Sequence, residues 1–206
     1  MFRAPLALIN ILKTNIMKNR ILILVIFSLF STPFFAQQII PVESVYNLRK
    51  NGATPDSAFS IKDVNNVLLR FVGTWKGIYN TNNYEIRIER ITVPFFEGVE
   101  DILIMRYKIT TSSGILKEET LSLPANEAVN ITGNYLQNRT YIFTYQGTDF
   151  ECGQYGDVYI SAGYNGNPNK MGLHLNPDHI LLDTSACPNG RAPMPFPEEM
   201  MWLYKQ

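Results

Sequence analysis

Residues 68–91, LLRFVGTWKGIYNTNNYEIRIERI, hold two alternating segments that are separated by a polar turn. In the second segment, Tyr84, Ile86 and Ile88 alternate with charged side chains. Alternation of this kind puts apolar side chains on one face of a strand and polar side chains on the other. With a turn at residues 81–83, the stretch predicts a β-hairpin with one buried face and one solvated face.

Further alternating segments follow at fairly even spacing, with turn residues between them. No segment after residue 72 shows a helical period, whereas apolar residues in 60–71 recur at spacings of three and four. That spacing predicts a short helical turn before the first strand. We therefore expect an all-β fold, an antiparallel closed barrel of about 8–10 strands, with a two-sheet β-sandwich as the alternative.

The N-terminal region has the layout of a secretory signal peptide. Residues 17–38, MKNRILILVIFSLFSTPFFAQQ, begin with Lys18 and Arg20, continue with an uncharged apolar core and reach the small residue Ala36. The core is about ten residues long, whereas a bilayer-spanning helix needs about twenty, so we favour cleavage after Ala36 over the alternative of an uncleaved anchor.

Three segments follow from this interpretation of the N-terminus. We expect residues 1–36 to be removed, with Met17 as the true start, 37–59 to form an irregular lead-in, and 60–206 to form a single barrel domain. The protein would then be exported to the periplasm or the medium, with no transmembrane segment in the mature chain.

The charge balance argues against a nucleic-acid partner. The full chain carries 18 basic and 18 acidic residues, and the expected leader carries four of the basic residues and no acid. The mature chain would therefore have 14 basic and 18 acidic residues, a net charge of −4. Nucleic-acid binding needs a basic face, and no polybasic block suggests binding to a membrane surface.

The two cysteines, Cys152 and Cys187, both lie in the expected mature chain. In an exported protein, an even pair of cysteines predicts one disulfide. The alternative is a pair of buried free thiols.

The start of the first strand carries a resemblance to known proteins. A helical turn followed by Gly73-Thr74-Trp75 resembles the opening of lipocalins and other calycins. The resemblance implies that Trp75 closes the floor of the barrel and that a basic residue of the last strand packs across its ring. Lys205 is the candidate for that role, through a cation–π contact. The other short lipocalin signatures are absent from the sequence.

A second resemblance covers most of the expected mature chain. The segment KDVNNVLLRFVGTWKG at 62–77, after a leader that ends in FFAQ, is similar to small exported proteins of unknown function from Bacteroidota. This resemblance implies a compartment and a lineage, and it implies no activity.

Residues with catalytic or metal-binding chemistry form no recognisable constellation. His174 and His179 flank an Asn-Pro turn, which is a poor spacing for a metal site. The adjacent acids Glu118 and Glu119 would point to opposite faces of a strand. We therefore predict no metal, no cofactor and no catalytic residue. We favour a binding protein over an enzyme. A hydrolase with acids from separate strands stays open as a third hypothesis.

Aromatic side chains are the remaining functional signal. The expected inward positions hold Tyr79, Tyr84, Ile86, Met105, Tyr107, Tyr141, Phe143 and Tyr145. If they line a cavity, the protein is a lipocalin-like binding module for a small, largely apolar ligand. If they fill the barrel, it is a structural or protein-interaction domain whose partner is a cell-envelope protein. Phe95 and Phe96, in the expected loop at 93–102, would mark a contact surface or a lid if they are exposed.

Overall fold

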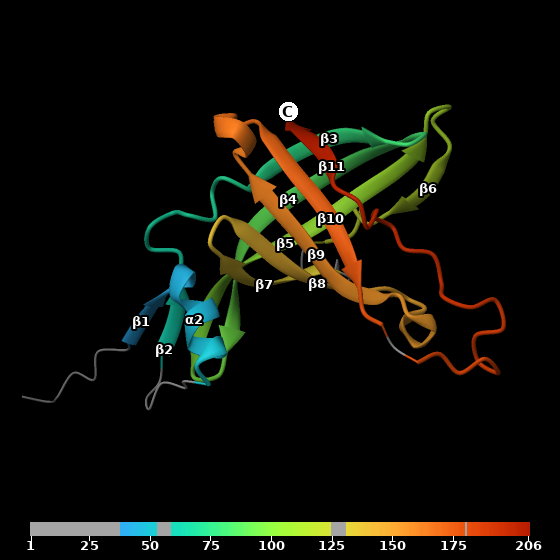
Figure 1. The fold of residues 1–206 in the computed structure, drawn as a ribbon. Helices are drawn as coiled ribbons and strands as arrows, with labels where there is room; N and C mark the ends of the chain where they lie inside the picture. The colour runs from blue at the N-terminus through green and yellow to red at the C-terminus, as the bar shows by residue number, and fades with distance from the viewer. Residues whose placement is uncertain (1–37, 53–58, 125–130, 180) are drawn as a thin grey trace, which may run out of the picture. The chain divides into compact units, whose positions relative to one another are not determined.

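The sheet of this computed structural model closes on itself. Eight antiparallel strands form a barrel, and the ring is completed where β7 pairs with β5 (Figure 1). The structure describes residues 38–52, 59–124, 131–179 and 181–206. The predicted antiparallel barrel is confirmed, and the sandwich alternative is excluded. The wall consists of β3 (Gly73–Tyr79), β4 (Asn82–Phe95), β5 (Gly98–Thr111), β7 (Ile131–Gln137), β8 (Thr140–Gln146), β9 (Tyr155–Ala162), β10 (Lys170–Pro177) and β11 (Met201–Lys205).

Three short strands extend the sheet on the β5 side of the barrel. β6 (Leu116–Glu119) pairs with the C-terminal part of β5. β2 (Phe59–Lys62) runs parallel to β5, and β1 (Gln38–Pro41) runs parallel to β2. The helical elements are η1 (Val42–Ser44), α2 (Val45–Lys50), η2 (Phe150–Cys152) and η3 (Tyr164–Gly166). No helix in the described ranges is both long enough and apolar enough to cross a membrane.

A short helical turn precedes the first barrel strand, as predicted, but it is α2 and not the stretch 60–71. That stretch forms β2 and a run of tight turns. The Asp63 carboxylate accepts hydrogen bonds from the backbone N–H groups of Val67 and Leu68, at 2.7 and 3.2 Å, and so competes with helical pairing. Asn66 has a left-handed φ of 55°, which interrupts a right-handed helix.

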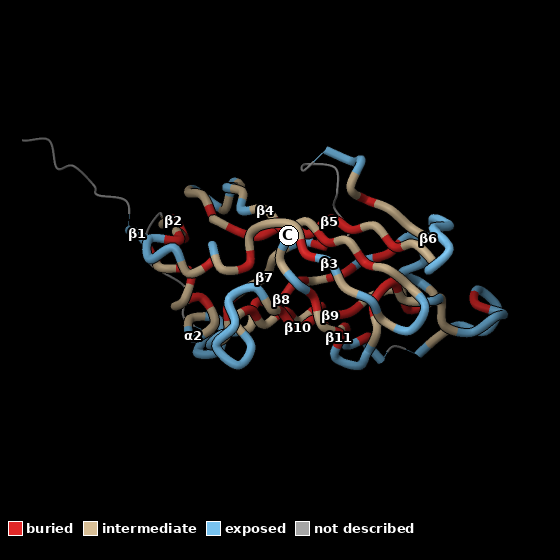
Figure 2. The backbone as a smooth tube through the Cα atoms, turned by 90° about the horizontal axis from the view of Figure 1, so that it is seen from above, coloured by how far each residue is buried: buried red, intermediate tan, exposed pale blue. Residues whose placement is uncertain are grey.

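The inward-facing side chains of the barrel strands form a continuous hydrophobic core. Figure 2 shows buried positions along the barrel strands and exposed positions in the loops. A barrel of about eight strands has an interior that side chains can fill. The largest fully buried side chains of this core include Trp75 of β3, Ile86 of β4, Leu103 and Tyr107 of β5, and Phe143 and Tyr145 of β8.

The turns that lead into β3 close one end of the barrel. Leu68 and Phe71 are fully buried there, beside Trp75. The indole Nε1 of Trp75 donates a hydrogen bond to the backbone carbonyl of Phe71 at 2.7 Å. The loop and the first strand are therefore joined by both apolar contact and a buried hydrogen bond.

Residues 181–200 cover the other end of the barrel. The Phe196 side chain is 2% exposed, and the Phe196 ring centroid lies 5.0 Å from that of Tyr107. Cys187 of this segment is bonded to Cys152 of η2, so the predicted disulfide is present. The backbone N–H of Ala192 also donates to the Cys152 carbonyl, at 2.9 Å. The disulfide thus attaches the covering segment to the barrel.

Candidate binding surface

The residues predicted to line a cavity are packed into the core. All of them except Tyr79 are at most 5% exposed. The Tyr141 ring centroid lies 4.9 Å from that of Phe143 and 6.0 Å from that of Phe71. Phe196 makes similar ring contacts with Tyr84 and Tyr107. The aromatic side chains contact one another across the interior, as a filled core requires.

The buried tyrosine hydroxyls have structural partners. The Tyr141 hydroxyl accepts a hydrogen bond from the Leu103 N–H at 3.1 Å, and the Tyr107 hydroxyl donates to a carboxylate oxygen of Glu118. Burial raises the pKa of Tyr107, Tyr141 and Tyr145 far above that of a free tyrosine. These phenols stay neutral at any physiological pH, and Tyr107 and Tyr141 serve as hydrogen-bonding core residues.

Trp75 and Lys205 lie together at the closed end. The Lys205 Nζ lies 5.3 Å from the centroid of the fully buried Trp75 ring, within the range of a cation–π contact. Lys205 also pairs with Trp75 in the ladder between β11 and β3. Both residues join the last strand to the first strand.

His174 lies on β10, and His179 follows this strand. Within the described residues, no group of three or more His, Cys, Asp and Glu side chains is placed to hold a metal. The His174 ring stacks on the Tyr159 ring at 4.9 Å, on the outer face of β9 and β10. Burial lowers the pKa of His174 below its usual value. The stacking of His174 on Tyr159 is therefore a packing contact between neighbouring strands.

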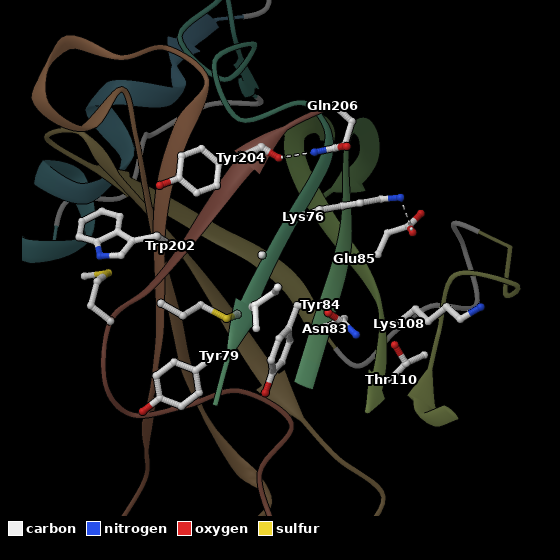
Figure 3. Close-up of a pocket in the computed structure, with 14 residues that line it drawn as sticks. Lys76, Tyr79, Asn83, Tyr84, Glu85, Lys108, Thr110, Trp202, Tyr204 and Gln206 are labelled. Carbon is white, nitrogen blue, oxygen red and sulfur yellow. Dashed lines mark hydrogen bonds and ion pairs between the residues drawn. The ribbon is translucent and has the colours of Figure 1, made fainter. Parts of the chain in front are cut away.

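A groove of about 950 Å³ lies on the outer wall of the barrel, over β3, β4, β5 and β11. Figure 3 shows Tyr79, Trp202 and Tyr204 along one side and Lys76, Glu85 and Lys108 along the other. Of the predicted interior residues, Tyr79 and Tyr84 contribute to its lining. The Tyr79 hydroxyl donates a hydrogen bond to Glu199 at 2.8 Å.

Large apolar side chains in this groove face solvent. Ile78 is 71% exposed, Tyr204 is 50% exposed and Met200 is 44% exposed. Trp202 is half-buried beside them. Its ring packs against the Tyr164 ring at 4.3 Å, and Lys170 Nζ lies 4.2 Å from its centroid. Contiguous exposed apolar surface of this kind marks interaction sites in soluble proteins.

The groove lies where the ladder between β3 and β11 ends. β3 continues to Tyr79 and β11 begins at Met201. Within the described chain, however, these strands pair only at Lys76–Tyr204 and Trp75–Lys205. Beyond that point Gly77 still lies close to the Trp202 backbone, but the two strands form no further ladder pair, and side chains from both strands line the groove.

The rim of the groove is polar. Lys76 and Glu85 form an ion pair at 3.1 Å across β3 and β4. The amide of Asn83 donates to the Thr111 carbonyl at 3.1 Å. Lys108 forms no ion pair with any described residue. An apolar floor with a polar rim is the general anatomy of a binding surface.

Sequence reasoning missed this surface, although two signals were available. Ile78 is an apolar residue at an outward position of β3, where Thr74 and Lys76 are polar. Trp202 and Tyr204 likewise share the outward parity of β11. Aromatic and branched apolar residues on a solvated face indicate contact more directly than those on a buried face.

Comparison with known proteins assigns the chain to a family and to no activity. No curated protein and no solved structure matches it. The profile of a family of unknown function, DUF6705, matches residues 17–180. This barrel, with its filled interior and its groove on the outer wall, therefore belongs to the family of unknown function DUF6705.

Proposed function

We propose that this chain is an exported interaction module that binds a protein of the cell envelope through the groove on its outer wall. One observation carries the proposal: Ile78, Met200 and Tyr204 are exposed around half-buried Trp202 on a barrel whose interior is packed. Exposed apolar side chains cost solubility, so a partner that covers them gives them a role.

The chemistry of the groove suits a protein partner. Tyrosine, tryptophan and methionine are enriched at the centres of protein interfaces, and charged groups collect at their rims. Tyr204 and Trp202 form such a centre, and Lys76, Glu85 and Lys108 form such a rim. The scaffold behind the groove is rigid, because its strands enclose a packed core.

Three observations support export. The leader-like segment ends at the small residue Ala36. The family match begins at Met17, the residue that we expect to be the true start of the chain. The disulfide between Cys152 and Cys187 persists in oxidising compartments.

Site-specific photo-crosslinking in the host cell tests the proposal. A photoreactive residue at position 78 should give a discrete crosslinked protein product, whereas one at the fully exposed position 181 should not. Ile78 and Leu181 are both exposed apolar residues, so random collisions with other proteins would label both positions. Equal labelling at both positions, or no protein product from position 78, would contradict a protein-binding groove.

A small, largely apolar ligand is the second candidate for this groove. Its volume of about 950 Å³ lies in the range of small-molecule sites, about 300–1,000 Å³. Native mass spectrometry separates the two candidates. A small molecule that is bound to the native protein and lost on denaturation would show as extra mass. If Ile78→Glu decreases the fraction of protein that carries this extra mass, the groove binds a small molecule.

A further inference from the structure

Phe96 combines two features that the fold itself does not favour. Its side chain is 88% exposed, at the tip of the hairpin that joins β4 to β5. Its backbone has a left-handed φ of 48°, a conformation in which a side chain crowds the following carbonyl oxygen. A large apolar residue at such a position gains little from burial and adds backbone strain.

The other left-handed turns of this chain use a different residue. Asparagine occupies every other described non-glycine position with positive φ: Asn66, Asn80, Asn138 and Asn165. Asparagine tolerates this conformation because its short polar side chain forms local hydrogen bonds. The chain thus meets the same backbone requirement with asparagine elsewhere. Strained residues of this kind cluster at binding sites, so Phe96 points to contact with another molecule.

The tip projects away from the barrel wall. β3 pairs with β4 only as far as Ile88, and β4 continues to Phe95 with β5 as its partner. Figure 1 shows this end of the hairpin beside β2 and α2. The Phe95 ring contacts the Phe96 ring edge-on, with the centroids 4.8 Å apart, and the Phe96 side chain stays exposed. The tip therefore presents one phenyl ring as a knob.

The tip and the groove are at opposite ends of the same pair of strands. Tyr84 of the groove and Phe96 of the tip are separated by twelve residues of β4, about 40 Å in an extended strand. A molecule cannot place its own tip in its own groove. Each molecule nevertheless offers one knob and one groove.

Charge adds to the match between the two surfaces. Glu97, next to the knob, is exposed and forms no ion pair with described residues, and Lys108 on the groove rim is likewise without an anionic partner there. An apolar knob beside a free anion fits an apolar groove beside a free cation.

We propose that the occupant of the groove is the hairpin tip of a second copy of this chain, with Phe96 inserted beside Ile78, Met200 and Trp202. The proposal rests on the proposed function and names its partner. Because different surfaces of the two copies meet, the contact is heterologous, and association continues from one copy to the next.

Sedimentation of the exported full chain tests this arrangement up to about 1 mM, since a single knob gives a weak, small interface. The weight-average mass should rise with concentration past that of a dimer. Phe96→Asn removes the knob and Ile78→Glu blocks the groove with a like charge, so each variant alone should stay monomeric. Leu181→Glu, at a fully exposed position outside both surfaces, should associate like the wild type.

Mixing the two variants provides the sharpest readout. Phe96→Asn keeps its groove and Ile78→Glu keeps its knob, so the mixture should form a one-to-one dimer and stop there. A wild type that is monomeric at the highest concentration, or a mixture that fails to dimerise, would overturn the proposal. A decrease of several degrees in the Tm of Phe96→Asn would also overturn the proposal, because the Phe96 side chain would then be needed for the stability of the fold.

The two proposals fail in different ways. If position 78 crosslinks a different protein and the chain does not self-associate, the groove still binds a partner and only the identity of the occupant is wrong. If position 78 crosslinks nothing and no association occurs, both proposals fall. A crosslinked dimer of this chain from position 78 would support both.

Discussion

At the scale of single residues, Glu100 shows what a buried carboxylate contributes to stability. Glu100 is 7% exposed on β5, opposite Ile61 of β2. Burial raises its pKa above the ordinary value of 4.5, and nearby Arg49 offsets part of that rise. The folded state therefore holds the proton more tightly than the unfolded chain does. Stability is lost as the pH rises through the unfolded pKa toward the folded pKa, and the loss remains at pH 7.

Removing this charge should stabilise the protein at neutral pH. We expect Glu100→Gln to raise the Tm at pH 7 by roughly 2 °C and to leave it nearly unchanged at pH 4. Thermal unfolding followed by circular dichroism at both pH values measures the effect. Glu97→Gln, at an exposed position on the same hairpin, is the control and should have little effect at either pH. A lower Tm for Glu100→Gln at pH 7 would mean that the carboxylate makes a favourable interaction.

At the scale of elements, the seam between β5 and β7 closes the barrel at a single described pair, Ile104–Thr132. Gly133 makes this close approach possible, because a Cβ there would overlap the Tyr141 hydroxyl and the Leu103 carbonyl oxygen. We expect Gly133→Ala to lower the free energy of unfolding by about 1–3 kcal/mol, the usual cost of overpacking. Urea denaturation measures it.

The control for the seam separates steric overlap from backbone strain. At Gly114 a Cβ would meet nothing within 4 Å, although φ is 85°. Gly114→Ala therefore reports the cost of the left-handed conformation alone, about 1 kcal/mol. If Gly133→Ala costs no more than Gly114→Ala, close packing at the seam is not what requires glycine.

A disulfide attaches the segment that covers the barrel mouth to η2. Cys187 and Cys152 are 35 residues apart, and removal of a bridge over such a loop costs about 2–4 kcal/mol. We expect reduction to lower the free energy of unfolding by that amount and to speed hydrogen exchange around Phe196 first. Hydrogen exchange in β4 should change less, because β4 keeps its hydrogen-bonded pairing with β3 and β5. Uniform exchange throughout, or unchanged stability on reduction, would show that the segment does not need the bridge.

At the scale of the whole molecule, the interior of the barrel is packed, and the binding that we propose is on its outer wall. Protein recovered through its own export route should have the mass of residues 37–206 less two hydrogens, the mature chain with one disulfide. Native and denatured mass spectrometry should agree, because Tyr107, Tyr141 and Phe143 occupy the interior. A retained leader would contradict the expected cleavage, and a bound apolar molecule insensitive to Ile78→Glu would contradict the filled barrel.

The class of fold followed from rules that operate over a few residues. Alternation at Tyr84, Ile86 and Ile88 identifies a strand with one buried face, because successive side chains point to opposite sides of any strand. A run of such segments with turns between them implies an antiparallel barrel or sandwich. The disulfide followed from the even number of cysteines and from the compartment that the leader-like segment led us to expect. The position of the helical turn did not, because Asp63 and Asn66 use local hydrogen bonding and backbone conformation to override the apolar spacing.

The choice between a barrel and a sandwich, and between a hollow and a filled interior, depended on contacts between distant segments. Alternation shows that Tyr141 and Phe143 face inward, but strand number and tilt determine whether inward side chains meet. Phe196 fills a mouth of the barrel from a loop that carries no strand signal. The groove exists because Ile78 and Trp202, over 120 residues apart in sequence, lie where two strands leave their ladder. Local periodicity specifies which face a side chain takes, and only closure of the sheet specifies its neighbours.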